Sequence, residues 1–400
     1  MKDLRILGLF IFVFSTSLFA DYKVNYKLNP SAKIIPDSNL NYKKDELKEG
    51  DILIFLEDGG KIFKVVDTKG KEYKTEPATI EEAFEFLDIS YSGDLKPSDI
   101  KKANYYFNGI GIVQSKSDKV FNIKLDNVIL FDYDGNSSTK DDVITADGFI
   151  NIFSNIDWKI DIEESSIKEI KFVNSVDQKS DFKINISTPI RIPVPFSKEF
   201  KLIEYEFNPV IIGPVVFTPI LSVYAGFNVG VAGKIMININ QKISGKYGAH
   251  YINGKWSGLT EVNDKSFKGF LSFIGADGWL KGYAGPKLKL NFYNTAAPYI
   301  EGFGYLKTQA DLTSYKPFIV DWKLFGGVES NLGVSVKIFS LGMKDFEKKI
   351  WGWESLINQG TIGSKLPKDI SVENINIEDE NYESLNKKLV ITFEKYLENK

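Results

Sequence analysis

The segment VVFTPILSVYAGFNVGVAGKIMININ, residues 215–240, alternates apolar and polar side chains over most of its length. Side chains of a β-strand point to opposite faces in turn, so the pattern predicts a strand with one apolar and one polar side. The apolar side would carry Val223, Ala225, Phe227, Val229, Val231, Ile235, Ile237 and Ile239, and the polar side Ser222, Asn228, Lys234, Asn238 and Asn240. Such a strand suits the core of a soluble sandwich or the wall of an outer-membrane β-barrel.

The rest of the chain favours the sandwich. A membrane barrel needs about 9 to 11 residues for each crossing, and all of its strands must be paired. The first half of the chain has the short, evenly spaced strands of ordinary soluble domains, and the chain ends in the charged FEKYLENK. We therefore predict a mainly β protein made of antiparallel sandwich and meander domains.

The N-terminus has the features of a secretory signal peptide. Lys2 and Arg5 precede the apolar run ILGLFIFVF, and Ala20 stands before the charged DYK. The run is too short to span a bilayer, which takes about 20 residues in a helix. The one later charge-free stretch of that length, 207–233, is broken by prolines and alternates like a strand. Residues 1–20 are the expected signal peptide, and we expect no transmembrane helix after its removal.

Composition argues against several classes of function. The chain contains no cysteine, which removes disulfides, a thiolate nucleophile, zinc–thiolate sites and a lipid-anchored cysteine. The formal net charge is -3, and the only arginines are Arg5 and Arg191. Without a clustered basic face we expect no nucleic-acid partner. About 380 mature residues are enough for two or three domains with ample core.

Four segments are expected after the signal peptide. They are a small β-barrel-like module with a short helix (21–100), an antiparallel meander (101–190), a long-stranded β-sandwich (191–363) and an acidic linker with an amphipathic helix (364–400). Capping-box spacing at Thr79 starts the short helix, which would carry Phe84 and Leu87. The C-terminal helix is predicted from the stripe Tyr382, Leu385, Leu389, Phe393, Tyr396 and Leu397.

Two groups of motifs resemble an uncharacterised family of secreted or cell-surface β-rich bacterial proteins. One group is GDILIF, KVVDTKG and TEPATIEEAFEF, and the other includes GPVVFTPILSVYAGFNVGV, GYAGPKLKLNFY and FGGVESNLGVSVKIF. The resemblance covers roughly residues 45–360 and does not include the tail. It implies a fold class and a location but no activity.

Oxygen-bearing side chains cluster in FDYDGNSSTKDD, which starts at Phe131. The candidate calcium ligands are Asp132, Asp134, Asn136, Asp141 and Asp142. The loop is not an EF-hand, because Ser137 and Val143 stand where that motif needs glycine and a final acid. Aspartate and asparagine also favour turns, so a solvated turn and a calcium site both stay open. We expect no other cofactor.

Three alternating runs begin with related triplets, which are Tyr224-Ala225-Gly226, Tyr283-Ala284-Gly285 and Phe325-Gly326-Gly327. Lys287 and Lys289 fall on the same side of their strand as Tyr283, which makes Tyr224, Tyr283, Lys287 and Lys289 a candidate ligand-binding set. Exposed rings beside lysines suit an acidic polysaccharide or a protein at the cell surface. The competing interpretation is that the rings pack across strands or beneath the C-terminal helix.

No catalytic signature stands out. His250 is the only histidine and lies close to the Asn253-Gly254 turn, so we place it at a hairpin tip. We expect an exported protein of the envelope or the extracellular space, periplasmic or external, that acts as a binding or structural surface component and not as an enzyme. The alternatives are an outer-membrane β-barrel, a secreted carbohydrate-active protein, for which two carboxylates would suffice, and a lipid-binding protein.

Overall fold

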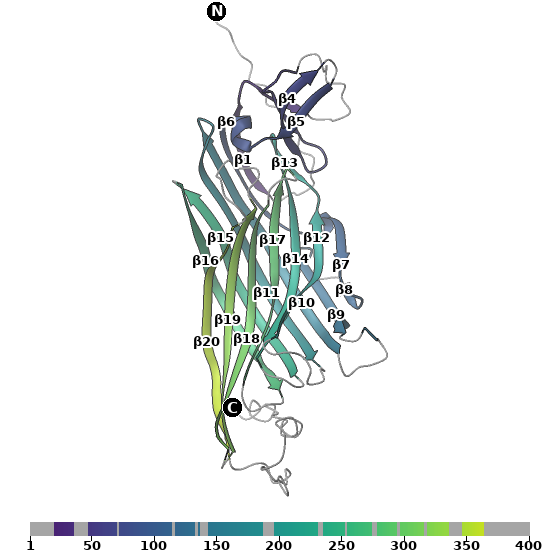
Figure 1. Ribbon diagram of the computed structural model, residues 1–400, viewed down its shortest axis with the longest axis vertical. Helices are drawn as coiled ribbons and strands as arrows, with labels where there is room; N and C mark the ends of the chain where they lie inside the picture. The colour runs from purple at the N-terminus through teal and green to yellow at the C-terminus, as the bar shows by residue number, and fades with distance from the viewer. Residues whose placement is uncertain are drawn as a thin grey trace, which may run out of the picture.

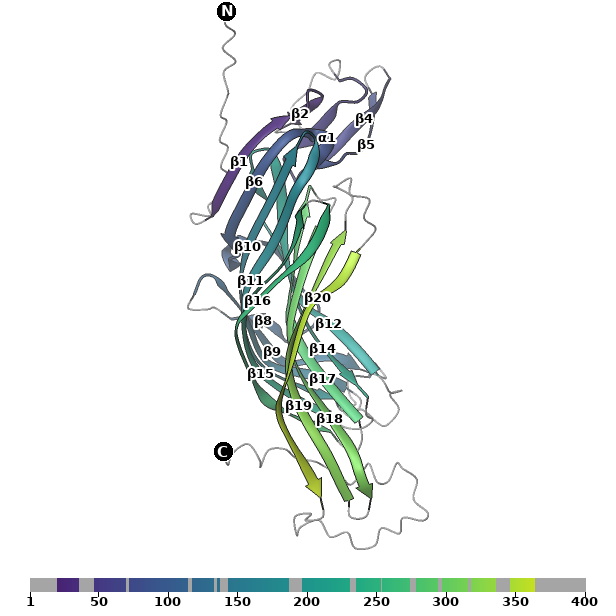
Figure 2. The same ribbon diagram turned by 90° about the vertical axis from the view of Figure 1, so that its left-hand side faces the viewer.

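The computed structural model of the chain is mostly β and almost without helix, as Figure 1 and Figure 2 show. It describes residues 20–35, 47–69, 72–113, 117–132, 135–136, 143–186, 196–230, 235–252, 254–273, 278–293, 297–315, 318–335 and 346–363. Two long sheets run along the molecule, and a small sheet sits at one end (Figure 1). The predicted mainly antiparallel, sandwich-like fold is confirmed. None of the helices within the described ranges is long and apolar enough to cross a membrane.

The first sheet has eight strands. In spatial order it contains β1 (Asp21–Leu28), β6 (Phe84–Asp94), β10 (Val143–Glu163), β11 (Ser166–Ile186), β15 (Ile235–Ile252) and β16 (Lys255–Phe273), with β9 (Val120–Asp132) beside β10 and β8 (Ile110–Ile112) beside β9. β10 is long enough to pair with β9 along its first half and with β6 along its second half. Both pairings are antiparallel.

The second sheet also has eight strands. In spatial order it contains β20 (Phe346–Gly363), β19 (Phe318–Ser335), β18 (Ala297–Tyr315), β17 (Gly278–Phe292), β14 (Val215–Val229), β12 (Phe196–Phe207) and β7 (Ile100–Tyr105), with β13 (Val210–Ile212) on β14. Both sheets therefore contain strands from the segment before residue 190 and from the segment after it. The predicted meander and the predicted sandwich segment build one pair of sheets together.

The small sheet lies between β1 and β6 in the sequence. Its order is β2 (Ala32–Ile35), β3 (Ile52–Phe55), β4 (Lys61–Lys69) and β5 (Glu72–Pro77), and β2 runs parallel to β3. This sheet lies within the predicted small β module, but the barrel-like closure of the module is not confirmed. A 3-10 turn, η2 (Pro97–Asp99), precedes β7. The C-terminal helix predicted within 364–400 lies outside the described residues.

The segment that suggested one alternating strand forms two strands. Its first part is β14 in the second sheet, and its last part begins β15 in the first sheet. β14 ends at Val229 and β15 begins at Ile235, so the segment contributes one strand to each sheet. Val223 and Phe227 of β14 and Ile239 of β15 are all fully buried. The predicted apolar side is confirmed at Val223, Ala225, Phe227, Val229 and Ile239, which are all buried. Val231 lies outside the described residues.

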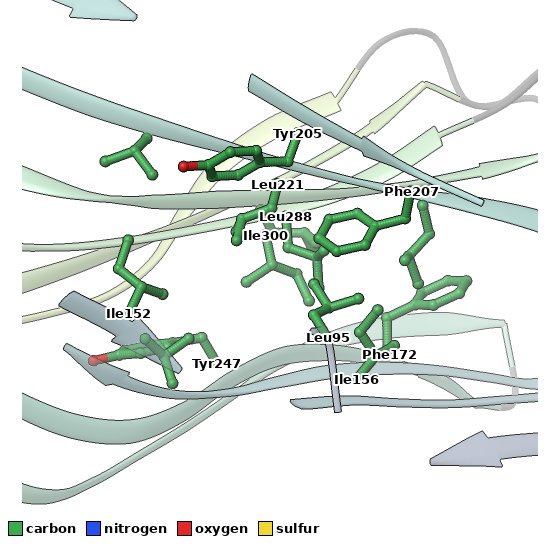
Figure 3. Packing of buried hydrophobic residues seen from close by; sticks show 14 of the residues in the cluster. Leu95, Ile152, Ile156, Phe172, Tyr205, Phe207, Leu221, Tyr247, Leu288 and Ile300 are labelled. Carbon is green, nitrogen blue, oxygen red and sulfur yellow. The ribbon is translucent and has the colours of Figure 1, made fainter. Parts of the chain in front are cut away.

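The apolar faces of the two sheets pack against each other and form one large core. Figure 3 shows Ile156 and Phe172 from the first sheet on the side opposite Leu221 and Leu288 from the second. Trp158 on β10 is completely buried, and its ring meets several other rings edge-on or stacked. These rings belong to Tyr91, Phe217 and Phe292, with centroids 6.3, 5.1 and 5.3 Å away.

The short helix is real but ends early. α1 spans Ile80–Ala83, and the side chains of Thr79 and Glu82 form the predicted capping box. The prediction that the helix continues through Phe84 and Leu87 is wrong, because β6 begins at Phe84 and pairs with β1 on one side and β10 on the other. As part of β6 both side chains are completely buried, and the strand forms two ladders of backbone hydrogen bonds. These gains outweigh the weak tendency of a four-residue helix to extend.

Replacement of Trp158 by alanine should lower the free energy of unfolding by about 3–5 kcal/mol, because it leaves a large cavity between the sheets. The matched control is Tyr105→Ala on β7. Tyr105 is 46% exposed, so its loss should change stability by no more than about 0.5 kcal/mol. Urea unfolding of both variants measures the difference. Equal effects would mean that the sheets are not held together at Trp158.

Candidate functional site

The candidate site is the outward surface of the second sheet, which we call the ring face. Along β17 the side chains of Leu280 and Leu288 are buried, so the alternate residues point outward. The ring face comprises Glu199, Lys201, Glu204, Tyr224, Lys281, Tyr283, Lys287, Lys289, Tyr299, Glu301, Phe303, Tyr305, Lys307, Phe325, Glu329, Glu354 and Leu356. The four predicted ligand-binding residues, Tyr224, Tyr283, Lys287 and Lys289, all lie on it.

A row of six residues crosses the ring face from β12 to β20. In spatial order it is Glu199, Gly226, Tyr283, Tyr305, Gly327 and Glu354. The Tyr283 hydroxyl donates to Glu199 at 3.2 Å, and the Tyr305 hydroxyl donates to Glu354 at 2.8 Å. The two rings therefore extend away from each other, and each passes over the glycine of the next strand.

Glycine is required beneath these rings. A Cβ atom at Gly226 would clash with the Tyr283 ring, and one at Gly327 would clash with the Tyr305 ring. Gly285, on the same side of β17 as Tyr283, lies close to the backbone of β18, where a Cβ atom would clash with the Gly302 carbonyl oxygen and with Cα of Phe303. These three glycines end the triplets that the sequence repeats. At Gly226 and Gly327 the repeat marks ring–glycine contacts between neighbouring strands, a known way to support a glycine in a sheet. At Gly285 it marks a close approach of two backbones.

Lysine side chains cover the other side of several rings. The Lys281 ammonium lies 3.9 Å from the centroid of Tyr305 and 3.0 Å from Glu329 on the next strand. The Lys281 side chain crosses the Tyr305 ring to reach the Glu329 carboxylate. Lys307 likewise lies 5.1 Å from the Phe325 centroid and 3.3 Å from Glu354. Each contact combines cation–π attraction with an ion pair.

The predicted binding residue Lys287 takes part in the same pattern. Its ammonium lies 3.9 Å from the Tyr299 centroid and 3.7 Å from Glu301. Tyr224 lies between two lysines, with Lys201 and Lys287 at 6.0 and 5.7 Å from its centroid. Lys289 is exposed. The sequence analysis did not identify Tyr305 or the glutamates of the ring face as site residues. The repeated triplets contain residues that lie beside them in the sheet, so they were the available signal.

The local electrostatics fix the protonation of these groups. Burial raises the pKa of Tyr305, and the nearby Glu354 raises it further, so the hydroxyl stays protonated and remains a donor. Burial alone would also raise the pKa of Glu204, but hydrogen bonds from Lys201 at 2.8 Å and Ser222 at 3.1 Å lower it overall. The carboxylate is therefore charged and matched by its neighbours.

One ion pair at the centre of the ring face is well shielded from solvent. The side chains of the Lys281–Glu329 pair are 16% and 18% exposed. On the first sheet the Lys242–Asp264 pair is 61% and 52% exposed. Other pairs of the first sheet are partly shielded, as Lys159 and Glu169 are at 33% and 21% exposed. On the ring face the rings and the lysine stems beside them provide the shielding. The ring face can therefore offer low relief and balanced charge to a partner.

The remaining candidates stay apart from the ring face. Asp132 accepts a hydrogen bond from the Gly135 amide at 3.0 Å, which is a local turn contact. Asp134, Asp141 and Asp142 lie outside the described residues, so the calcium prediction stays a prediction. Within the described ranges no group of three or more His, Cys, Asp or Glu side chains could hold a metal ion.

The only histidine lies on the outer surface of the first sheet. His250 belongs to the paired part of β15, where it is opposite Ser257, so the predicted position at the hairpin tip is wrong. Its Nε2 atom is 2.9 Å from Glu169, which also accepts from Lys159 at 2.6 Å. The histidine therefore belongs to a surface network of charged residues.

No protein-family model, curated protein or solved structure matches the chain. The geometry of the ring face is therefore the observation that bears on function.

Replacement of Gly226 by alanine should destabilise the protein by about 1–3 kcal/mol, because the new methyl group displaces the Tyr283 ring from its position over residue 226. It would also lie 2.9 Å from the Lys198 carbonyl oxygen. Gly111→Ala is the matched control, since a Cβ there meets nothing within 4 Å. Thermal unfolding compares them. A fully stable Gly226→Ala variant would contradict the ring–glycine contact.

Loss of the Glu204 carboxylate should change the acid sensitivity of folding. Its folded pKa lies below the ordinary 4.5, so its stabilisation is complete above that value and is lost as the pH falls through the folded pKa. We expect the unfolding free energy of Glu204→Gln to fall less steeply than that of the wild type below pH 4.5. Glu261→Gln, on the exposed side of β16, is the control for loss of one charge. Identical acid profiles for Glu204→Gln and the wild type would rule this contribution out.

Proposed function

We propose that the chain is an exported protein of the cell envelope or the extracellular space, and that it works as a binding or structural surface component with the ring face as its contact surface. The observation that carries this proposal is the pairing of rings and charges in a poorly hydrated outward surface. A surface that serves only solubility gains nothing from flattened lysines and buried tyrosines. Protein contact surfaces are enriched in aromatic residues.

The position of the first strand supports export. β1 begins at Asp21, the residue that follows the expected cleavage point, and Asp21 is paired with Ser92 of β6. Removal of residues 1–20 would thus leave every residue of β1 in place. A cysteine-free chain also folds without regard to the oxidising conditions outside the cytoplasm.

The contacts of the rings favour a protein partner over a polysaccharide. A sugar stacks on an open ring face. Tyr305 has Gly327 beneath it and the Lys281 ammonium above it, so a sugar would have to displace the lysine. Four of the lysines that an acidic polysaccharide would need, Lys201, Lys281, Lys287 and Lys307, are already matched by glutamates. Both observations make a protein the better occupant.

Export can be tested in cells. The chain recovered outside the cytoplasm should begin at or near Asp21 by N-terminal sequencing, because Lys2, Arg5 and the apolar run form the targeting signal. Substitution of Leu9 and Val13 by aspartate should keep the full-length precursor inside. The same two charges placed at Tyr22 and Tyr26, which are 50% and 41% exposed on β1, form the control and should leave export intact. A full-length cytoplasmic wild-type product would refute the proposal.

A further inference from the structure

We propose that the occupant of the ring face is a second copy of this chain, so that the second sheets of two copies pack face to face about a twofold axis. The inference rests on the proposed role of the ring face as a contact surface. It goes beyond that role because it names the partner. Face-to-face packing of twisted sheets is an established arrangement, with about 10 Å between the two sheets.

The balanced charge of the ring face favours a second copy of the chain over a strongly acidic or strongly basic partner. Lys201, Lys281, Lys287 and Lys307 each lie within ion-pair distance of a glutamate of the same face. A strongly acidic or basic partner would leave its own charges unmatched when it covered these neutral pairs, which is costly at a dry interface. A second ring face carries the same balanced pattern. An isologous contact therefore brings no net repulsion.

The size of the face also fits a dimer. Six strands, from β12 to β20, form its width, and five successive outward positions form its length. With about 4.8 Å between strands and about 6.7 Å between outward positions, the face covers roughly 24 by 27 Å, or about 650 Å². A standard stable interface buries about 800 Å² on each partner. One ring face thus provides most of the area that a dimer needs.

An exposed leucine marks the border of this surface. Leu356 on the edge strand β20 is 44% exposed and lies opposite Phe325, which the Lys307 ammonium covers. Burial of the leucine side chain against a copy would remove apolar area from water at the edge of the contact. The first sheet offers a matched residue, because Ile252 on its outer surface is also 44% exposed.

The test is the mass of the full chain after removal of residues 1–20, measured by sedimentation over a dilution series. We expect a concentration-dependent dimer. Leu356→Asp should weaken the dimer and shift the mass toward that of one chain, because a charged group replaces apolar area that the copy would bury. Ile252→Asp should leave the dimer unchanged. Circular dichroism and thermal unfolding establish that both variants are folded.

A second measurement does not depend on Leu356. The chain has no cysteine, so Lys289→Cys on the ring face and Lys246→Cys on the first sheet each carry a single thiol at an exposed position. Thiol labelling of Lys289→Cys should slow at concentrations where the dimer forms, while labelling of Lys246→Cys should not.

A monomer at every concentration would overturn the inference. So would a dimer that persists in Leu356→Asp while the thiol of Lys289→Cys reacts at the monomer rate. Binding of envelope polysaccharide by a monomer, lost in a ring-face variant, would name another partner and also refute the copy. In each of these cases the export experiment stands by itself, so failure of the dimer and failure of the proposed function are distinguishable.

Discussion

The strict alternation of side chains along a β-strand is the constraint on which the structure depends. Every residue of a long strand points either into the space between the sheets or away from it, so burial of one side commits the other to the outside. The core around Trp158 satisfies the inward side with rings from both sheets. The outward side chains are then fixed in position, and the ring face is a consequence of the core.

The two sheets are also tied by hydrogen bonds at one interruption. Pro286 lies in β17, a central strand, and has no amide hydrogen to donate. Gly285 and Pro286 have no partners in the ladder between β17 and β18. The adjoining Ala284 carbonyl accepts from Gln178 and Gln241 of the first sheet at 3.2 and 3.3 Å. These hydrogen bonds join the two sheets and satisfy a buried carbonyl group that would be expensive to leave without a partner.

The two outer surfaces show how neighbouring strands decide the character of a polar side. Both carry lysines and acids, and both pair them. Glycines on the second sheet let the tyrosines lie flat, and the flat rings in turn give lysines such as Lys281 a surface to cross. On the first sheet the Lys242–Asp264 pair stands in solvent. On the second sheet the glycine and aromatic residues that face each other across strands are what make the charged outer surface a candidate contact surface.

The sequence by itself determined the β class, the alternation, the start of the short helix at Thr79 and the side of the strand on which Tyr283 and Lys287 lie, because these depend on neighbours along the chain. Which strands pair was decided by the tertiary structure. Strand pairing placed the two halves of residues 215–240 in different sheets. It also made Phe84 the first residue of β6 and not part of the short helix. It also set Tyr305 beside Tyr283 and over Gly327. The periodicity of a sequence predicts which face of the sheet a residue takes. The residue that it meets on a neighbouring strand depends on the register of the two strands, and a strand's own periodicity does not specify its partner.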